Sequence, residues 1–312
     1  KLDITKDNLE KIKDEKIKDK SILFTLDQIK NDLLELGIEY DNWFFESSLF
    51  ENNVIQTVEK ILNDKKLIFE KDGAKWFKSS DFFTENDVVI QRSKNEGHTY
   101  FFSDMAYHYD KFHIRNYENV INIFGADHHS HVDRLKSAVK ALDINPEKLK
   151  ILLTQIVHFK NQNKIQKFSK RSGNIYTVKD LIEIVGKDVC RFNFLNRSLD
   201  SQQEFDLELA TQESSENPVY YIQYAYARLC SIINSFSTEV ELKKVNLKLL
   251  ESEYEKELID NLDYFPEVVL DCVYKLQTQN LTQYSVDLAR SLQKFYENCR
   301  VISNDEELTK AR

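Results

Sequence analysis

The chain has 312 residues, a formal net charge of -9 and 41% hydrophobic residues, so it is long enough to bury the cores of two domains. Its sequence has no run of 18 apolar residues, which excludes an obvious membrane-spanning helix, and the acidic balance disfavours unselective nucleic-acid binding without excluding a local basic face. Six glycines and three prolines predict a helix-rich protein with few tight turns. We expect a monomeric, cytoplasmic protein.

The four cysteines are scattered and form no CxxC pair; they are Cys190, Cys230, Cys272 and Cys299. This spacing disfavours both a zinc site and a disulfide framework. We therefore expect free thiols and no tightly bound metal.

The N-terminal part predicts two helices. Residues 1–20 alternate lysine with acidic residues and predict an exposed helix or a frayed end. Thr25 and Gln28 form a capping-box pattern, which predicts a helix that begins there and stops at Gly37. A second helix is predicted over 53–65.

A hairpin and then an alternating pattern follow. Residues 67–69 and 74–79 flank Lys71-Asp72-Gly73, which is typical of a hairpin turn. Beyond it we predict strands at 88–90, 120–124 and 151–159, and a helix at 129–142. Strands separated by helices of this length indicate a parallel sheet, whose ligands bind where strands end. Both Gly125–His131 and the stretch 167–174 follow predicted strand ends, so we expect a nucleotide site there.

The remainder of the chain is helical in pattern. Apolar residues recur at three- and four-residue spacing, which predicts an antiparallel bundle. The predicted helices span 178–185, 189–195, 218–236, 253–276 and 281–301, with Pro218 in a first turn. The fold class is therefore α/β followed by all-α.

The stretch Lys167-Phe-Ser-Lys-Arg-Ser-Gly-Asn174 concentrates cations on an acidic protein. Lys167, Lys170 and Arg171 are joined by Lys160 and Lys164 just before it. A local cationic loop suggests an anionic ligand, and a triphosphate is the natural candidate. The alternative is a solvated basic loop.

Asp127, His128, His129 and His131 follow Gly125 closely. Only His128 and His131 have a spacing that suits two metal ligands on one helix, so a metal site is the weaker interpretation. The stronger one is close approach of a sugar at Gly125, with Asp127 accepting hydrogen bonds from ribose hydroxyls.

Tyr100, Asp104 and His108 are four residues apart, so on a helix they would share one face. A buried aspartate needs a cationic partner, and a guanidinium or ammonium substrate would supply it. The alternative is an internal salt bridge with Lys111 or Arg115.

Arginine and tyrosine recur together in the helical part. Arg191, Arg197, Arg228 and Arg300 occur there, and Tyr220, Tyr221, Tyr224 and Tyr226 surround one of them. Arginine with interleaved tyrosine can hold phosphates and stacked bases. A tyrosine-rich bundle core is the equally weighted alternative.

Taken together, these stretches resemble the class I arginyl-tRNA synthetases. KFSKRSGN resembles the KMSKS loop of that class, with Phe168 in place of methionine and Arg171 in place of serine. Nearly the whole chain resembles the family in sequence, including the segments 102–112, 122–143, 188–210, 216–232 and 287–301.

The resemblance implies a role for each candidate residue. Tyr100, Asp104 and His128 would line the arginine pocket, with Asp104 pairing the guanidinium. ATP, accompanied by Mg²⁺, would lie against Gly125, Asp127, Lys167 and Lys170, and the two lysines would be catalytic. The tRNA(Arg) partner would meet Arg197, Tyr224, Arg228 and Arg300. The expected products are arginyl-adenylate with pyrophosphate, and then arginyl-tRNA.

The resemblance also implies a division of the chain into a catalytic domain at 1–195, holding the second half of a Rossmann-like fold, and an anticodon-binding domain at 196–312. The family's HIGH signature would precede residue 1 and a few helical turns would follow Arg312. We therefore expect a fragment that is inactive by itself.

Three alternatives are less well supported by these residues. One is a tRNA-binding synthetase fragment or paralogue without catalysis, and another is a different class I synthetase such as the cysteinyl type. The third is a helical scaffold, which would leave the cluster at the strand ends unexplained.

Overall fold

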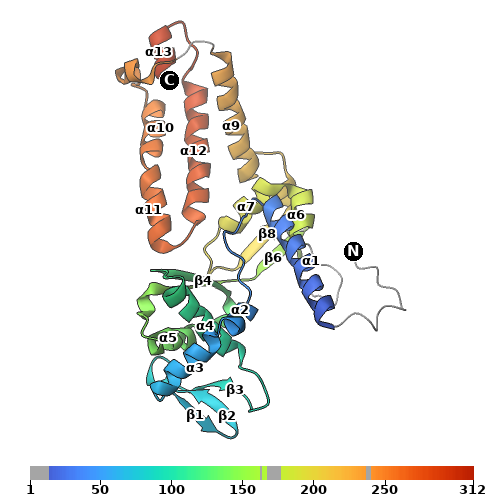
Figure 1. The fold of residues 1–312 in the computed structure, drawn as a ribbon. Coiled ribbons are helices and arrows are strands. Elements are labelled where there is room, and N and C mark those ends of the chain that lie inside the picture. The colour runs from blue at the N-terminus through green and yellow to red at the C-terminus, as the bar shows by residue number, and fades with distance from the viewer. Residues whose placement is uncertain (1–13, 162–163, 167–176, 237–239) are drawn as a thin grey trace, which may run out of the picture. The chain divides into compact units, whose positions relative to one another are not determined.

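A computed structural model describes residues 14–161, 164–166, 177–236 and 240–312 (Figure 1). The chain forms two compact units. The inserted unit comprises Tyr40–Ile156 and Leu199–Gln202. The helical unit comprises the described residues up to Glu39, together with Val157–Ser198 and Gln203–Arg312.

The inserted unit begins with two short helices and a three-stranded antiparallel sheet. Its elements are α2 (Ser47–Glu51), α3 (Val54–Asp64), β1 (Ile68–Lys71), β2 (Ala74–Phe77), β3 (Val88–Gln91), α4 (Tyr100–Tyr109), β4 (Val120–Gly125), α5 (His131–Ala141) and β5 (Leu149–Thr154). The predicted hairpin is confirmed: Lys71 pairs with Ala74 across a turn in which Asp72 and Gly73 both have positive φ.

Strand β3 corrects the prediction for residues 88–90. The strand exists, but it pairs antiparallel with β2 instead of joining the parallel sheet. The connection after Phe77 is too short for the helical crossover that a parallel partner needs.

Strands β4 and β5 form the predicted parallel pair, in register from Val120 opposite Leu149 to Gly125 opposite Thr154. Helix α5 is the crossover, and its fully buried Leu135, Ala138 and Val139 belong to the core of the unit.

The single strand predicted at 151–159 is wrong, because the structure divides it. Strand β5 ends at Thr154, and β6 (Val157–Asn161) belongs to a second sheet with β7 (Lys164–Gln166) and β8 (Gln203–Asp206). Strand β6 is parallel to β8 and antiparallel to β7. The apolar run continues across the break, so periodicity alone does not reveal it.

The helical unit contains the remaining helices: α1 (Asp14–Glu35), α6 (Val178–Val185), α7 (Lys187–Leu195), α8 (Leu207–Thr211), α9 (Pro218–Ser235), α10 (Glu253–Asp263), α11 (Phe265–Lys275), α12 (Gln279–Asn298) and α13 (Glu306–Ala311). Helix α12 packs against α9, α10 and α11, as Figure 1 shows. One core cluster joins α9 to α12 and another surrounds Phe205 and Cys190. The predicted α/β and all-α parts are both present.

Two helix predictions need correction. Helix α1 contains Thr25 and Gln28 in its interior, so they do not cap its start, although Gly37 ends it with a φ of +75°. The helix predicted over 253–276 is interrupted at Tyr264, where Pro266 in the first turn of α11 has no N–H to continue the ladder.

Candidate functional site

Helix α4 positions two of the predicted arginine-pocket residues. Phe101, Phe102 and Met105 bury one face of the helix in the core of the inserted unit. Tyr100, at the first position of the helix, is 87% exposed, and Asp104 on the next turn is half-buried. The apolar face fixes the helix, and the two polar side chains are left at its edge.

The Asp104 carboxyl group lies in an environment that disfavours its charge. Burial and, to a smaller extent, the neighbouring Glu46 carboxylate raise its pKa to about 6, although the charges of Lys111 and His128 act in the opposite direction. A cationic ligand would stabilise the ionised form of this carboxylate, because its charge would offset the cost of desolvation.

The alternative of an internal salt bridge at Asp104 is not supported. Arg115 forms its ion pair with Asp110, at 2.6 Å, and Lys111 donates to Asn122 at 3.0 Å. In the described part of the chain no cationic nitrogen lies within ion-pairing distance of the Asp104 carboxylate.

His108 does not share the face of Tyr100, which corrects the sequence expectation. Its ring is 2% exposed, with Nδ1 2.7 Å from the carbonyl oxygen of Asp104 and Nε2 2.7 Å from the Asn122 amide nitrogen. Residues eight apart on a helix are rotated by roughly 80°, and this drift carries His108 inward. Burial and the nearby Lys111 lower its pKa to about 4.

The end of β4 carries the predicted ribose and arginine contacts. The side chains of Asp127 and His128 are 83% and 52% exposed, and a Cβ at Gly125 would lie 2.5 Å from Asp127 Oδ1. His128 contributes to the electrostatics of Asp104, so the structure brings these two predicted pocket residues close together. The ring centroids of His128 and His131 are 5.4 Å apart. The structure describes no group of three or more side chains arranged to hold a metal.

The cationic stretch is only partly described. Lys167, Lys170 and Arg171 lie outside the described residues. Lys160, on β6, pairs with Asp206 at 3.4 Å, beside the end of β8. It therefore supports the sheet.

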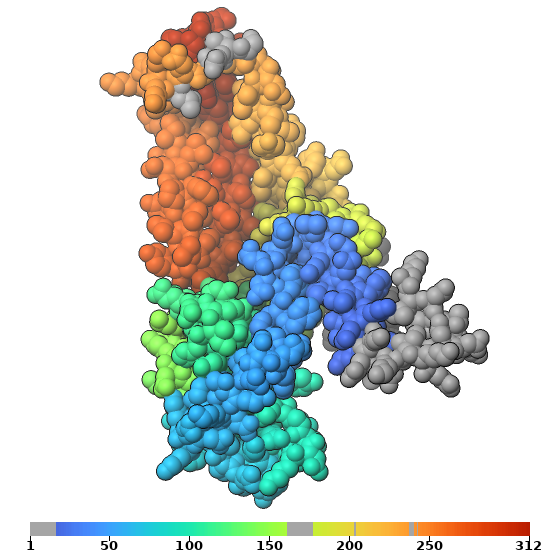
Figure 2. Space-filling model, in the orientation of Figure 1, coloured from blue at the N-terminus to red at the C-terminus, as the bar shows by residue number. Residues whose placement is uncertain are grey.

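A groove of about 820 Å³ in the helical unit holds three of the four predicted tRNA contacts. Tyr224 and Arg228 of α9 line it, together with Tyr296 of α12 and Arg300 just beyond that helix. Helix α12 lies recessed between α9 and the α10–α11 pair in Figure 2. The groove presents aromatic rings and guanidinium groups to one surface.

The Arg228 guanidinium is fixed within this groove by stacking and hydrogen bonds. Its carbon lies 4.7 Å from the ring centre of Tyr224 and 4.2 Å from that of Tyr296. Its nitrogens donate to the Tyr224 hydroxyl and to Gln293 Oε1, each at 2.6 Å. The arginine is thus pre-ordered, and Tyr224 is still 48% exposed.

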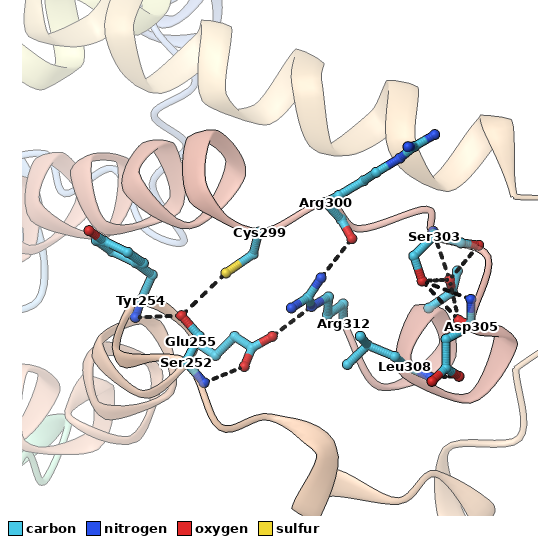
Figure 3. A network of polar contacts seen from close by, with 10 residues as sticks. Ser252, Tyr254, Glu255, Cys299, Arg300, Ser303, Asp305, Leu308 and Arg312 are labelled. Atoms are coloured by element: carbon cyan, nitrogen blue, oxygen red, sulfur yellow. Dashed lines mark hydrogen bonds and ion pairs between the residues drawn. The ribbon is translucent and has the colours of Figure 1, made fainter.

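A buried ion pair supports the wall that carries Arg300. Arg312 Nε donates to Glu255 Oε1 at 2.6 Å, and Arg312 Nη1 donates to the backbone carbonyl of Arg300 at 2.8 Å. Glu255 is 2% exposed and also accepts from the Ser252 backbone N–H, completing a capping box. The Arg300 side chain points away from this pair in Figure 3.

The other arginines and tyrosines have different environments. Arg197 lies exposed beyond α7 and is not among the residues that line this groove. Arg191 donates to the backbone carbonyls of Leu36 and Gly37, so it caps the end of α1. Tyr226 lines a separate apolar cavity of about 390 Å³ between α9, α11 and α12.

Sequence reasoning missed Glu46 and Asn122, and it considered Lys111 only as a salt-bridge partner. All three affect Asp104, directly or through His108. Glu46 lies far from Asp104 in sequence, so no spacing signal links them. Asn122 lies in an apolar strand, and a polar amide at such a position could have indicated a buried hydrogen bond.

Two family models match the chain. The model described as the class I tRNA synthetase (R) catalytic domain matches residues 4–205. The model described as the DALR anticodon binding domain matches residues 222–312.

Curated relatives share much of the sequence. An arginine–tRNA ligase of Dehalococcoides mccartyi strain CBDB1 is 46% identical over 285 residues, covering 91% of this chain and 51% of the relative. One from Caldanaerobacter subterraneus subsp. tengcongensis is 45% identical over 291 residues, covering 92% and 52%. The chain thus spans about half the length of the curated relatives it matches.

Solved structures share the fold. A structure described as an arginyl-tRNA synthetase of Campylobacter jejuni has a TM-score of 0.85 at 30% identity, covering 98% of this chain and 66% of that one. The Thermus thermophilus arginyl-tRNA synthetase has a TM-score of 0.76 at 20% identity, covering 96% and 60%, which bears on the fold alone. In the part of the chain that the structure describes, no helix is long and apolar enough to cross a bilayer.

Proposed function

The chain belongs to the class I tRNA synthetases of the arginine type, and from this premise we propose that the whole protein is an arginine–tRNA ligase. The arginine carboxylate would attack the α-phosphate of ATP, which forms arginyl-adenylate and releases pyrophosphate. The arginine would then be transferred to the terminal ribose of tRNA(Arg). The observation that carries the proposal is the half-buried Asp104 carboxylate, which has no internal cationic partner among the described residues.

In this proposal the arginine side chain enters between α4 and the end of β4. Its guanidinium pairs with Asp104, while Tyr100 and His128 line the pocket. Glu46 adds negative charge on the same side. A planar guanidinium suits paired oxygen acceptors better than an ammonium does, which favours arginine over lysine.

ATP, as its Mg²⁺ complex, would meet Gly125 and Asp127, with Lys167 and Lys170 on its phosphates. When the arginine carboxylate attacks the α-phosphate, lysine charges would stabilise the departing pyrophosphate. The absence of a side chain at Gly125 supports close approach of a sugar. We assign the catalytic domain to residues 1–195 and the anticodon-binding domain to 196–312, in a cytoplasmic monomer.

The first test is arginine-dependent ATP–pyrophosphate exchange by the whole protein, with tRNA present. We expect Asp104→Asn to lower kcat/KM for arginine by at least about 100-fold, because a charged hydrogen bond in a desolvated pocket is lost. Glu118→Gln, which alters an exposed carboxylate of the same unit, is the matched control. Exchange that does not depend on arginine would contradict the proposal.

The groove of the helical unit supports the tRNA partner. Arg300→Ala should weaken tRNA binding and reduce the slope of log K against log salt by about 1, and Lys256→Ala, on an exposed part of α10, is the control. Arg197 and Arg228 are tested in the same series. Full tRNA binding with no exchange activity would favour the alternative of a paralogue without catalysis.

A further inference from the structure

A chain of hydrogen bonds beneath Asp104 takes no part in the contacts assigned above. Lys111 Nζ donates to Asn122 Oδ1 at 3.0 Å, and Asn122 Nδ2 lies 2.7 Å from His108 Nε2. His108 Nδ1 lies 2.7 Å from the backbone carbonyl oxygen of Asp104. These hydrogen bonds therefore connect the turn after α4 to β4, and β4 back to α4.

Chemistry sets the direction of every bond in this chain. A lysine ammonium can only donate, so Asn122 presents its oxygen to Lys111 and its amide N–H to His108. His108 Nε2 must then accept, which leaves the single ring proton on Nδ1, directed at the Asp104 carbonyl. The lysine, acting through Asn122, and the Asp104 carbonyl therefore favour the same tautomer of a neutral histidine.

Burial makes this arrangement costly to disturb. His108 is 2% exposed and Asn122 is 6% exposed, so water does not replace a lost partner readily. Lys111 Nζ also lies 4.2 Å from the ring centre of Tyr107. A complete buried network rigidifies the elements that it joins.

The joined elements are the two walls of the arginine pocket. Helix α4 carries Asp104 one turn before His108, and strand β4 carries Asn122 three residues before its end at Gly125, which leads to His128. We propose that the Lys111–Asn122–His108 chain is a positioning device that holds Asp104 and His128 at the separation that an arginine side chain requires. This inference rests on the proposed function.

Such positioning would make the enzyme selective for the length of the substrate side chain. L-Homoarginine carries the same guanidinium on one additional methylene, and one methylene can change kcat/KM by roughly 10- to 200-fold where a pocket is rigid. A loosened pocket should accept the longer side chain more readily. The nucleotide contacts should change little.

The test measures pyrophosphate exchange by the whole protein with arginine and with homoarginine. For Asn122→Leu we expect the KM for arginine to rise about tenfold, the KM for ATP to stay within about twofold, and the preference for arginine to fall about fivefold or more. Two further variants test the two hydrogen bonds of His108 separately. His108→Asn can still donate to the Asp104 carbonyl, and His108→Gln can still accept from Asn122. Each should show part of the same shift.

Two comparisons separate positioning from a general loss of structure. His113→Gln removes a ring that contacts the Leu142 carbonyl at 3.1 Å, without a bond to the chain, and it should leave the preference unchanged. Asn122→Asp has nearly the same shape and keeps the acceptor for Lys111, but it has no N–H for the Nε2 of the neutral His108. It should therefore lower the preference for arginine in the same direction as Asn122→Leu, although it leaves no cavity.

The outcomes are distinct. If the natural protein shows no arginine-dependent exchange, the proposed function fails and this inference fails with it. If exchange is normal but Asn122→Leu leaves the preference for arginine within twofold, or raises both KM values together, the positioning role alone is overturned.

Discussion

Asp104 and His108 respond to pH in opposite directions, although they lie one helical turn apart. The folded state raises the pKa of Asp104 from 3.8 to about 6, so it binds a proton more readily than the unfolded chain does. This contribution stabilises the fold at acid pH and is lost as the pH rises through 6. His108 has its pKa lowered from 6.5 to about 4, so its contribution is present above 6.5 and is lost as the pH falls.

Asp104→Asn should therefore separate stability from ligand binding. Removing a desolvated charge should raise the free energy of unfolding at pH 7 by about 1 to 2 kcal/mol, after allowance for the partial exposure of the carboxylate. Arginine binding should be lost. Urea titration and calorimetry measure the two effects, and a destabilised variant would show that Asp104 has an internal partner.

Arginine affinity should depend on the same carboxylate. The ligand binds the ionised form, so below pH 6 the dissociation constant should rise about tenfold for each pH unit. Isothermal titration between pH 5 and 8 provides the measurement. A flat profile in this range would exclude Asp104 as the group that pairs with the guanidinium.

The Asp104→Asn variant should also reveal the acid sensitivity of His108. In the natural protein the two contributions oppose each other between about pH 4 and 6.5. With Asp104 replaced by the neutral asparagine, the free energy of unfolding should fall by up to about 3 kcal/mol as the pH is lowered from 6.5 to 4, because the buried imidazole resists protonation. Adding His108→Gln should remove that fall.

At the scale of single elements, α9 depends on a buried cap. Asn217 is 4% exposed and accepts hydrogen bonds from the backbone N–H groups of Val219 and Tyr220. Its amide nitrogen donates to the carbonyls of Ala210 and Gln212. Four bonds from one side chain fix where the helix begins, and Pro218 follows in the first turn.

Replacing this cap should destabilise the helical unit. Asn217→Ala should cost about 2 to 3 kcal/mol, since it removes a cap and leaves buried carbonyls without a donor. Asn246→Ala changes an exposed asparagine cap in the same unit and should cost less than about 0.5 kcal/mol. Equal effects in urea denaturation would contradict this account of α9.

The pair of Glu255 and Arg312 permits a sharper test at the junction of α10 and α13. Arg312→Met should cost about 3 kcal/mol or more, because a carboxylate that is 2% exposed is left without its cation. Replacing Glu255 by methionine as well should recover most of that loss. A double variant no more stable than Arg312→Met would show that the polar network, and not the buried charge, dominates.

At the scale of the whole molecule, the two units have separate hydrophobic cores. One core lies in the inserted unit and includes Phe102, Met105 and Leu135. Two others lie in the helical unit, around Phe205 and around Leu292. The proposed arginine pocket is built on the first core, and the groove lined by Tyr224, Arg228 and Arg300 is built on the last.

Ligand protection should follow this division. Saturating arginine should slow amide hydrogen exchange in α4 and β4 of the inserted unit, because a ligand stabilises the state that it binds. Exchange in α9 and α12 should be unchanged by arginine alone and slowed by tRNA. Arginine protection confined to the helical unit would place the amino-acid site elsewhere.

Local patterns were sufficient for much of the fold. Helical spacing predicted α3, α5, α6, α9 and α12 within a few residues, and the Lys71-Asp72-Gly73 turn predicted its hairpin. The end of β4 at Gly125 was likewise predicted. These features depend on side-chain period, turn chemistry and strand length, which neighbouring residues settle among themselves.

The sequence by itself determined the type of most elements, the strand end at Gly125 and the residues that resemble an arginine site. Only the tertiary structure decided that β3 joins an antiparallel sheet, that the run at 151–159 divides between two sheets, and that His108 turns away from Tyr100 toward Asn122. It also set Glu46 beside Asp104. Strand partners, burial and electrostatic neighbours depend on residues that are distant in the chain, and local periodicity carries no information about them.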